Sequence, residues 1–215
     1  MSTLADLRQE YARAQLSREH VTDDPIEQFR DWFDEAQDAE LEEPNAMTLS
    51  TAAADGTPSA RIVLLKGLDA RGFHFYTNYE SRKGTDLSQN PHAALTFLWK
   101  PLERQVRVEG PVERLPEEES TDYFHSRPRG AQLGAWASPQ SHVIEDREVL
   151  EQKLAAVTDE YQDRDDIPRP SHWGGYVVHP TEIEFWQGRP NRLHDRLRYR
   201  RDDADADWTL ERLAP

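Results

Sequence analysis

Apolar and polar positions at the start of the chain repeat with the spacing of a helix. Residues 3–16 have this spacing but are mostly polar, so we expect residues 1–20 to form a mobile arm. A second helix is predicted to begin at Pro25, because Asp24 suits the N-cap and proline fits the first turn. Its apolar residues share one face, which we expect to pack on the core: Ile26, Phe29, Trp32, Phe33 and Ala36.

The spacing changes to that of strands at Met47, where short apolar runs alternate with turn residues. The first three runs are separated by turns at Asp55-Gly56 and at residues 70–72, and we expect them to form three consecutive antiparallel strands. A short helix is predicted between Ser81 and Asn90. The strands predicted in this half are 47–52, 59–67, 73–78, 92–100 and 103–115.

The second half of the chain is helical at first and returns to strands at its end. Its predicted elements are helices at 117–127 and 142–162 and strands at 175–188, 196–201 and 208–215. Strands first, helices between and strands last are typical of a closed antiparallel barrel with helices around it. The sequence therefore predicts a mainly β fold with surrounding helices, in which residues 21–215 form a single domain.

Composition adds a strong negative charge to this fold. The formal net charge of the 215 residues is −15, which argues against a nucleic-acid partner because nucleic-acid binders normally carry a basic face. The chain has no cysteine, so thiol chemistry is excluded and any redox activity needs a bound cofactor. No run approaches the roughly 20 apolar residues that span a bilayer, so we expect no membrane association and a cytoplasmic location.

Arginine is abundant, whereas lysine occurs only at Lys66, Lys83, Lys100 and Lys153. In an acidic chain this bias indicates a halophilic protein, because concentrated salt screens the repulsion among surface carboxylates. An ordinary acidic surface is the alternative.

Two candidate binding clusters lie in the strand region. Arg61 and Lys66 bracket an apolar strand and lie roughly 16–17 Å apart along it, so they suit two parts of one extended ligand. Because side chains alternate along a strand, residues 61 and 66 would point to opposite faces, so one ligand could contact both only if the strand twists or has a bulge. The alternative is an ordinary core strand with solvated ends. Arg82 and Lys83 follow Ser81 at a predicted helix start, where free N–H groups, a hydroxyl and two cations suit a phosphate. An exposed basic turn would look the same.

Two further clusters lie later in the chain. Residues 123–129 combine aromatic, hydroxyl and guanidinium groups, which suit a phosphate, although cations are also favourable at a helix C-terminus. Arg192 and Arg196 flank His194 shortly after Trp186, an arrangement that fits a planar anionic ligand. No cluster has the spacing of metal ligands, so no metal site is predicted.

The run IEFWQGRPNRLHDR at residues 183–196 resembles the signature of the pyridoxamine 5'-phosphate oxidase family at every specified position. Further matches follow in family order over nearly the whole chain: RIVLLK, FYTN, SRK, LERQVRVEG, YFHSRPR, LGAW, PQS and SHWGGY. The resemblance implies an FMN-binding split β-barrel and a homodimer whose active sites are shared by both subunits. It also implies FMN-dependent oxidation of pyridoxamine or pyridoxine 5'-phosphate by dioxygen, giving pyridoxal 5'-phosphate, hydrogen peroxide and, from the amine, ammonia.

The resemblance further implies roles for individual residues. The flavin positions are Arg61, Ile62, Val63, Leu64, Leu65, Lys66, Tyr76, Thr77, Arg82, Lys83, Gln105, Gln140, Ser141, Trp186 and Arg196. The substrate positions are Lys66, Tyr123 and Arg127 at the phosphate, Arg192, Leu193 and His194 around the pyridine ring, and Arg8 and Tyr11 in a lid. Arg192 and His194 are the expected catalytic residues, which polarise the ring and orient its reacting carbon.

Two positions depart from the family's pattern. Gln9 stands where a second arginine is usual, and Ala131 stands where a phosphate-binding serine is usual. The missing hydroxyl removes one hydrogen bond, typically worth about 1 kcal/mol, unless Gly130 or water compensates.

Two other functions remain open from the sequence. A different split-barrel flavoprotein, such as a flavin reductase or another oxidase, would share the flavin positions but would not need Arg192-Leu193-His194 or Tyr123 with Arg127. A carrier that delivers pyridoxal phosphate or FMN would have the same site residues, and turnover with oxygen separates it from an oxidase.

Overall fold

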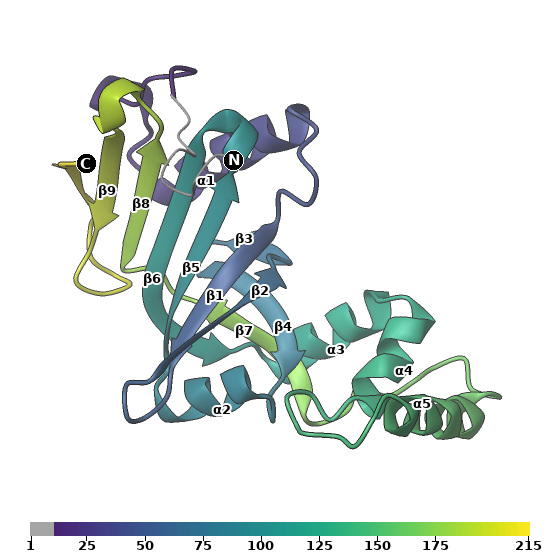
Figure 1. The fold of residues 1–215 in the computed structure, drawn as a ribbon. Coiled ribbons are helices and arrows are strands. Elements are labelled where there is room, and N and C mark those ends of the chain that lie inside the picture. Colours follow the sequence, from purple (N-terminus) through teal and green to yellow (C-terminus); the bar gives the residue numbers. More distant parts are fainter. Residues whose placement is uncertain (1–10) are drawn as a thin grey trace.

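A bent antiparallel sheet forms the centre of the molecule, and the computed structural model describes residues 11–215 of it (Figure 1). The strands pair in the order β10-β9-β8-β6-β5-β1-β2, while β7 pairs with β6 and β4, and β4 pairs with β3. The strands are β1 (Ala46–Ala52), β2 (Pro58–Leu64), β3 (Gly67–Asp69), β4 (Gly72–Asn78), β5 (His92–Trp99), β6 (Arg104–Arg114), β7 (Trp173–Val178), β8 (Glu182–Gln187), β9 (Asp195–Arg200) and β10 (Thr209–Leu213).

The sheet divides along the long strand β6. Residues 104–109 of β6 pair with β8, whereas residues 112–114 pair with β7. Gly110 lies at the division, and a Cβ there would come within 1.9 Å of the main-chain oxygen of His179. Only glycine permits this close approach of the two backbone segments.

Within residues 11–215 five α-helices flank the sheet, with α3, α4 and α5 gathered beyond β4 and β7 in Figure 1. They are α1 (Pro25–Asp38), α2 (Arg82–Gln89), α3 (Glu117–Ser126), α4 (Arg129–Ala137) and α5 (Glu148–Tyr161). Helix α1 packs Phe29, which is 0% exposed, against Phe73 and Phe97 of the sheet. A second, smaller core around Phe124 and Trp173 joins the helical region to β7.

The predicted helix at Pro25 is confirmed. The Asp24 carboxylate accepts a hydrogen bond of 2.8 Å from the backbone N–H of Ile26, as an N-cap should. Four of the five residues on its predicted apolar face are buried, and Phe33 packs against the same core while partly exposed. The sequence pattern was reliable here because capping and helical spacing indicate the same start.

Several expected boundaries were wrong. Residues 11–16 are not helical, residues 142–147 precede α5 without joining it, and α4 was not predicted. The expected strand 175–188 is two strands, since residues 179–181 form the link between β7 and β8. Pro180 lies in this link and has no N–H to donate to a ladder.

The pairing of the early strands also differs from the expectation. Strands β1 and β2 are antiparallel neighbours as predicted, but β4 pairs with β3 and β7 instead of β2. Within residues 11–215 the ladders leave β2, β3 and β10 at open ends, so the sheet curls into a half-barrel and is not closed by hydrogen bonds. None of the helices in this range has the length and apolar character needed to cross a bilayer.

Candidate active site

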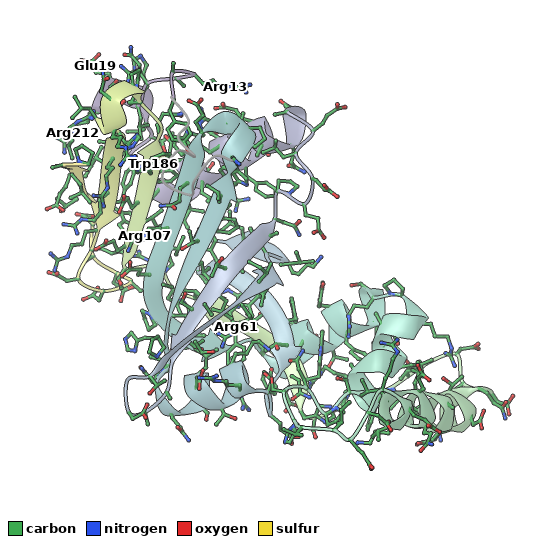
Figure 2. All side chains as sticks on the ribbon, viewed as in Figure 1. Arg13, Glu19, Arg61, Arg107, Trp186 and Arg212 are labelled. Atoms are coloured by element: carbon green, nitrogen blue, oxygen red, sulfur yellow. The ribbon has the colours of Figure 1, made fainter. Side chains whose placement is uncertain are left out.

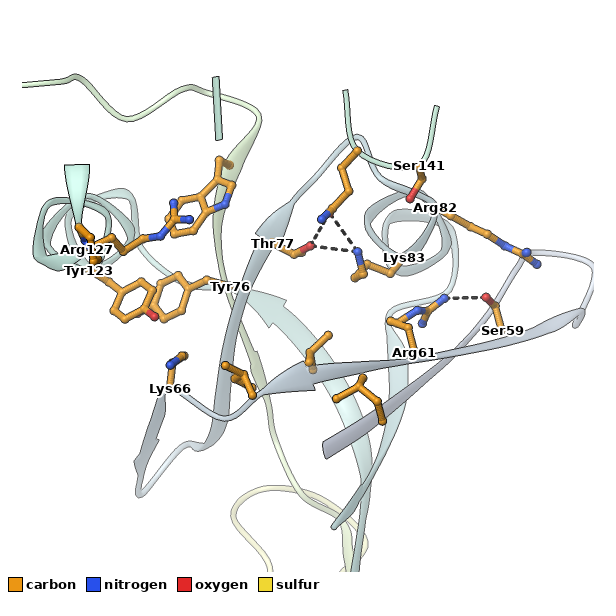
Figure 3. A pocket seen from close by; sticks show the side chains of 16 residues that line it. Ser59, Arg61, Lys66, Tyr76, Thr77, Arg82, Lys83, Tyr123, Arg127 and Ser141 are labelled. Atoms are coloured by element: carbon orange, nitrogen blue, oxygen red, sulfur yellow. Dashed lines mark hydrogen bonds between the residues drawn. The ribbon is translucent and has the colours of Figure 1, made fainter. Parts of the chain in front are cut away.

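A cavity of about 740 Å³ opens between β2, β4, α2, α3 and the segment before α5 (Figure 3). It contains most of the residues that the sequence assigned to a flavin and to a phosphate. The lining residues are Ser59, Arg61, Ile62, Val63, Leu64, Lys66, Tyr76, Thr77, Arg82, Lys83, Tyr123, Arg127, Pro128, Gln140, Ser141 and Trp173. Among residues 11–215 no group of three or more acidic or histidine side chains is arranged to hold a metal ion.

A break in the chain between β2 and β3 brings Arg61 and Lys66 to the same cavity. The backbone N–H of Lys66 donates to the main-chain oxygen of His74 at 2.9 Å, so the chain leaves the line of β2 there. Leu65, at the break, turns into the core and is 8% exposed. The break therefore lets Arg61 and Lys66 face the same cavity although they would point to opposite faces of a regular strand. Leu65 was predicted to line the flavin site, but it does not line the cavity.

One end of the cavity is a cluster of fixed donors around Lys83. The Lys83 ammonium donates to Gln140 Oε1 at 3.0 Å and to the hydroxyls of Thr77 and Ser81 at 3.2 Å. Ser81 also caps α2, because its Oγ accepts from the N–H of Gly84 at 3.4 Å. Burial, with a smaller contribution from the charge of Arg61, lowers the pKa of Lys83 to about 8. Lys83 is therefore a buried cation whose charge favours an anionic ligand.

Arg61 lies beside this cluster and is fixed by its own hydrogen bonds. Its guanidinium donates to Thr51 Oγ1 at 2.8 Å and to Ser59 Oγ at 2.6 Å. The carboxylate of Asp86 lies 3.9 Å away and offsets part of its charge. Burial lowers the pKa of Arg61 from its usual value, so the group is desolvated while remaining charged.

The other end of the cavity contains Lys66, Tyr123 and Arg127, separated from the Lys83 end in Figure 3. The rings of Tyr76 and Tyr123 stack with centroids 3.8 Å apart, and Trp173 continues the stack 5.7 Å from Tyr76. The Arg127 guanidinium lies 4.5 Å from the Trp173 ring centroid. Burial raises the pKa of Tyr76 to about 12, so this phenol stays protonated at neutral pH.

Arg127 has one buried nitrogen, Nη1, without a hydrogen-bond partner in the described part of the chain. An unpaired buried donor costs about 1–3 kcal/mol, and more when it is charged. Burial also lowers the pKa of this guanidinium. A phosphate oxygen would satisfy the nitrogen, since guanidinium and phosphate match in geometry and charge.

Three predicted flavin residues lie away from this cavity, on the outer face of the sheet. Gln105 pairs with Trp186 across β6 and β8, and Trp186 pairs with Arg196 across β8 and β9. Their strand neighbours Val106 and Phe185 point into the core, so alternation places this row on the opposite face. Figure 2 shows Trp186 well separated from Arg61.

Arg196 is fixed in this row by a carboxylate. Its Nε and Nη2 donate to the two oxygens of Glu184 at 2.7 and 3.0 Å. Glu184 is 3% exposed, and this bidentate bond raises the pKa of Arg196.

The predicted catalytic residues lie in the turn that follows β8. His194 Nδ1 accepts from the N–H of Arg189 at 3.1 Å, and its ring lies 4.6 Å from that of Trp186. Burial, with a smaller effect from Arg192, lowers the pKa of His194. Arg192 has a φ of 60° and the preceding Asn191 a φ of 56°. Such left-handed positions cost roughly 1–2 kcal/mol outside glycine and cluster at functional sites.

Leu193 and Tyr11 complete this turn, whereas Arg8 lies outside the described residues. Leu193 is 69% exposed. The Tyr11 ring lies 5.8 Å from those of both Trp186 and His194, in edge-on contacts. The structure therefore brings Tyr11 to the predicted ring-binding residues and leaves both groups outside the cavity. Whether they contact a ligand stays a prediction.

Two cavity residues, Ser59 and Trp173, were not assigned from the sequence, and Pro128 was included only as part of the candidate cluster at residues 123–129. The sequence did contain a hint at Trp173, because two consecutive glycines follow it and glycines within a strand often mark close packing. In the structure Gly174 and Gly175 pack closely against Tyr79 and Tyr76. Ser59 had no such hint, since its role depends on the side chain of Arg61 folding back along β2.

Comparison with known proteins assigns the chain to a family. Residues 33–161 match the family described as pyridoxamine 5'-phosphate oxidase. The chain belongs to the pyridoxamine 5'-phosphate oxidase family. Residues 173–215 match the C-terminal dimerisation region of pyridoxine 5'-phosphate oxidase, so both matches together cover most of the chain.

Relatives in this oxidase family resemble the chain over its full length. A pyridoxine/pyridoxamine 5'-phosphate oxidase from Salinibacter ruber is 83% identical, with all of both chains covered. A protein of the same name from Acaryochloris marina is 58% identical over 100% of this chain and 96% of its own. The chain is therefore an enzyme of an oxidase family, as predicted.

Solved structures confirm the predicted split-barrel fold. PhzG from Burkholderia lata, solved with tetrahydrophenazine-1-carboxylic acid, has a TM-score of 0.87 and 32% identity, with 95% of this chain and 99% of that chain covered. A pyridoxamine 5'-phosphate oxidase-related, FMN-binding protein from Nostoc punctiforme has a TM-score of 0.68 over 87% of this chain and 97% of its own. At 17% identity this second likeness supports the fold alone.

Proposed function

We propose that this enzyme oxidises pyridoxamine 5'-phosphate and pyridoxine 5'-phosphate to pyridoxal 5'-phosphate, using FMN and dioxygen and releasing hydrogen peroxide and, from the amine, ammonia. The observation that carries the proposal is a single cavity with an anion-binding cluster at each end. Lys83 and Arg61 mark one end, and Lys66 with Arg127 marks the other. Two such ends suit a cofactor phosphate and a substrate phosphate in one site.

The Lys83 end fits the phosphate of FMN. Arg61, Arg82 and Lys83 supply three cations there, and the hydroxyl of Thr77 and the amide of Gln140 are already held by Lys83. Residues 62–64 supply the apolar wall between the two ends. When bound, FMN accepts the two electrons that leave the substrate.

The Arg127 end fits the phosphate of the substrate. The unpaired Nη1 of Arg127 and the ammonium of Lys66 would donate to phosphate oxygens, and the Tyr123 hydroxyl lies on the same wall. Binding the phosphate there fixes the rest of the substrate without touching the reacting carbon. Such remote binding lowers the barrier through orientation, so unphosphorylated substrates should react poorly.

We further propose that the active site is completed by a second copy of the chain. Gln105, Trp186, Arg192, His194 and Arg196 lie outside the cavity of their own chain. Ile62 and Leu98, on the outward-facing sides of β2 and β5, are 65% and 66% exposed. A symmetric dimer would cover such apolar positions and bring these five residues of one copy to the cavity of the other. The C-terminal match to a dimerisation region supports this arrangement.

In this arrangement Arg192 and His194 act on the pyridine ring. Arg192 would donate to the ring or its hydroxyl, and its charge would favour electron density there. The Nδ1 of His194 is occupied by the N–H of Arg189, so Nε2 is the atom available to the substrate.

We also propose that the acidic surface is adapted to concentrated salt. The net charge of −15 and the presence of only four lysines support this, because two of those lysines, Lys66 and Lys83, line the cavity. Thermal unfolding followed by circular dichroism in 0.1 M and 3 M potassium chloride tests the point. A melting temperature that does not rise with salt would contradict it.

The oxidase proposal is tested on purified protein in high salt with added FMN and pyridoxamine 5'-phosphate under air. Pyridoxal 5'-phosphate and hydrogen peroxide should form in equal amounts. Bound flavin without product would indicate a different split-barrel flavoprotein, and release of bound pyridoxal phosphate without peroxide would indicate a carrier. A protein that binds no flavin would refute the whole proposal.

A further inference from the structure

Helix α3 carries Glu119 on the face that holds Tyr123, and Arg127 is the C-cap residue of the same helix. Glu119 precedes Tyr123 by four residues, so the two share one face of the helix, and Arg127 follows at the C-terminal end, eight residues after Glu119. Eight residues correspond to about 12 Å along a helix axis. Glu119 therefore lies at one end of a stripe whose other end reaches the cavity.

Arg71 ties this carboxylate to the hairpin formed by β3 and β4. Its Nη1 and Nη2 donate to the two carboxylate oxygens of Glu119 at 2.9 and 2.8 Å. Its Nε and Nη2 also donate to Asp69 Oδ2 at 3.0 and 2.7 Å. Asp69 lies in the same hairpin, so the guanidinium is oriented from the hairpin side and presents its fork to the helix.

The same hairpin positions the other half of the proposed phosphate site. Lys66 immediately precedes β3 and is held to β4 through the main-chain oxygen of His74. Tyr76 of β4 stacks on Tyr123 of α3 at 3.8 Å. Hairpin and helix are thus joined by an ion pair at the far end and by a ring stack at the cavity, and the phosphate-binding residues are divided between them.

Other contacts hold α3 to β7. Ser120 Oγ accepts from the N–H of Gly175 at 3.1 Å, and Phe124 is buried in the smaller core. These contacts keep the helix folded against β7, whereas the Arg71–Glu119 pair connects it to the hairpin. Breaking the pair should therefore shift Arg127 relative to Lys66 without unfolding the helix.

We propose that Arg71 and Glu119 are positioning residues, which set the separation between Lys66 and the Tyr123–Arg127 pair and thereby the affinity for a phosphate monoester. The inference rests on the proposed function for the identity of the substrate, but any ligand that bridges Lys66 and Arg127 reports the coupling. Neither side chain lines the cavity, and their side chains are 41% and 39% exposed. An exposed bidentate pair adds little to global stability, so its main effect is on geometry.

The variants Arg71→Gln and Glu119→Gln test this, with Arg147→Gln as the matched control. Arg147 forms an exposed ion pair with Glu151 at 2.9 Å at the start of α5, and neither residue lines the cavity. Binding of pyridoxal 5'-phosphate and of pyridoxal is measured by calorimetry on the FMN-loaded protein, together with KM and kcat for pyridoxamine 5'-phosphate.

Each α3 or hairpin variant should raise the Kd and the KM for the phosphorylated ligands by about fivefold, which is close to the upper limit for the loss of an exposed ion pair. Pyridoxal binding and kcat should stay within about twofold of the parent, the range of weakly coupled sites. The double variant should be no worse than either single one, because both remove the same pair. Arg71→Lys should fall between the parent and Arg71→Gln, since lysine keeps the charge without the fork.

The outcomes separate this inference from the proposed function. Unchanged Kd and KM in both variants would overturn the inference while the oxidase activity stands. An equal loss of pyridoxal binding would also overturn it, because the site would then have loosened generally. Weaker pyridoxal 5'-phosphate binding in a protein that never oxidises the amine would support the inference and refute the oxidase. A parent protein that binds no pyridoxal 5'-phosphate would refute both.

Discussion

The cavity and the turn at residues 190–194 were both predicted as functional, yet they are held in different ways. In the cavity, Arg61 and Lys83 each donate several hydrogen bonds to fixed oxygens within the same chain. In the turn, His194 has one backbone donor, and Arg192 is in a left-handed conformation. The difference teaches that the cations of the cavity are already oriented by partners within one chain, whereas the turn residues have few such partners, which is why we propose that a second copy completes their site.

The largest effect should follow from removing the ring-side cation. Arg192→Ala should lower kcat by about a hundredfold, the typical loss of one charged group that stabilises a transition state. Steady-state peroxide production measures it. Arg200→Ala, on the exposed end of β9, is the control and should leave kcat unchanged. A similar loss in both variants would mean that the turn has no special role.

Loss of the phosphate-side cation should act differently. Arg127→Ala should raise KM for pyridoxamine 5'-phosphate by about thirtyfold, because a hydrogen bond to a charged group contributes roughly 1.5–3 kcal/mol. For pyridoxamine, which has no phosphate, the Arg127→Ala variant should have the same KM as the parent protein. If kcat fell while KM stayed constant, Arg127 would belong with the ring-side residues and the comparison would fail.

Mixing these two variants tests whether the cavity and the turn meet across subunits. Random reassociation of Arg127→Ala and Arg192→Ala chains gives half heterodimers, each with one intact site, and so about a quarter of the parent activity. Each variant alone should remain nearly inactive at low substrate. No recovery after verified subunit exchange would indicate that each site is built from a single chain.

A smaller effect should come from the pH dependence of FMN binding. The pKa of Lys83 is lowered to about 8, so above that pH the unliganded protein loses a cation that an FMN phosphate needs. FMN affinity should therefore fall as the pH rises from 7 to 9. Lys83→Arg keeps the charge and should flatten this part of the profile, as measured by flavin fluorescence. A profile that is identical in the parent and in Lys83→Arg would assign the titration to another group.

The smallest effect is expected at Ala131. This residue lies in the first turn of α4, shortly after the cavity residue Pro128, and is partly exposed. Ala131→Ser should tighten the binding of pyridoxal 5'-phosphate by about fivefold, the value of one neutral hydrogen bond. Ala131→Gly is the control that adds no donor. Weaker binding in the serine variant would show that the phosphate lies elsewhere.

The sequence predicted which cationic residues cluster better than it predicted how the clusters are arranged. Ser81 before Arg82 and Lys83 indicated a capped helix start with cations, and the structure confirms that arrangement because capping is a local interaction. The turn of the chain at Leu65 was not predictable, since it depends on a hydrogen bond between Lys66 and His74 across the hairpin. The pairing of β4 with β7 was missed for the same reason, because partners about 100 residues apart leave no local pattern.

The division of β6 at Gly110 has a consequence for the proposed homodimer. The end of this strand pairs with β7, next to the chain's own cavity, and in the proposed homodimer its start would carry Gln105 toward the partner's site. In that arrangement the eleven residues of β6 would form a continuous covalent path between the two active sites. Ligand binding that displaces one end of β6 would be felt at the other end, so the two sites of a dimer need not fill independently.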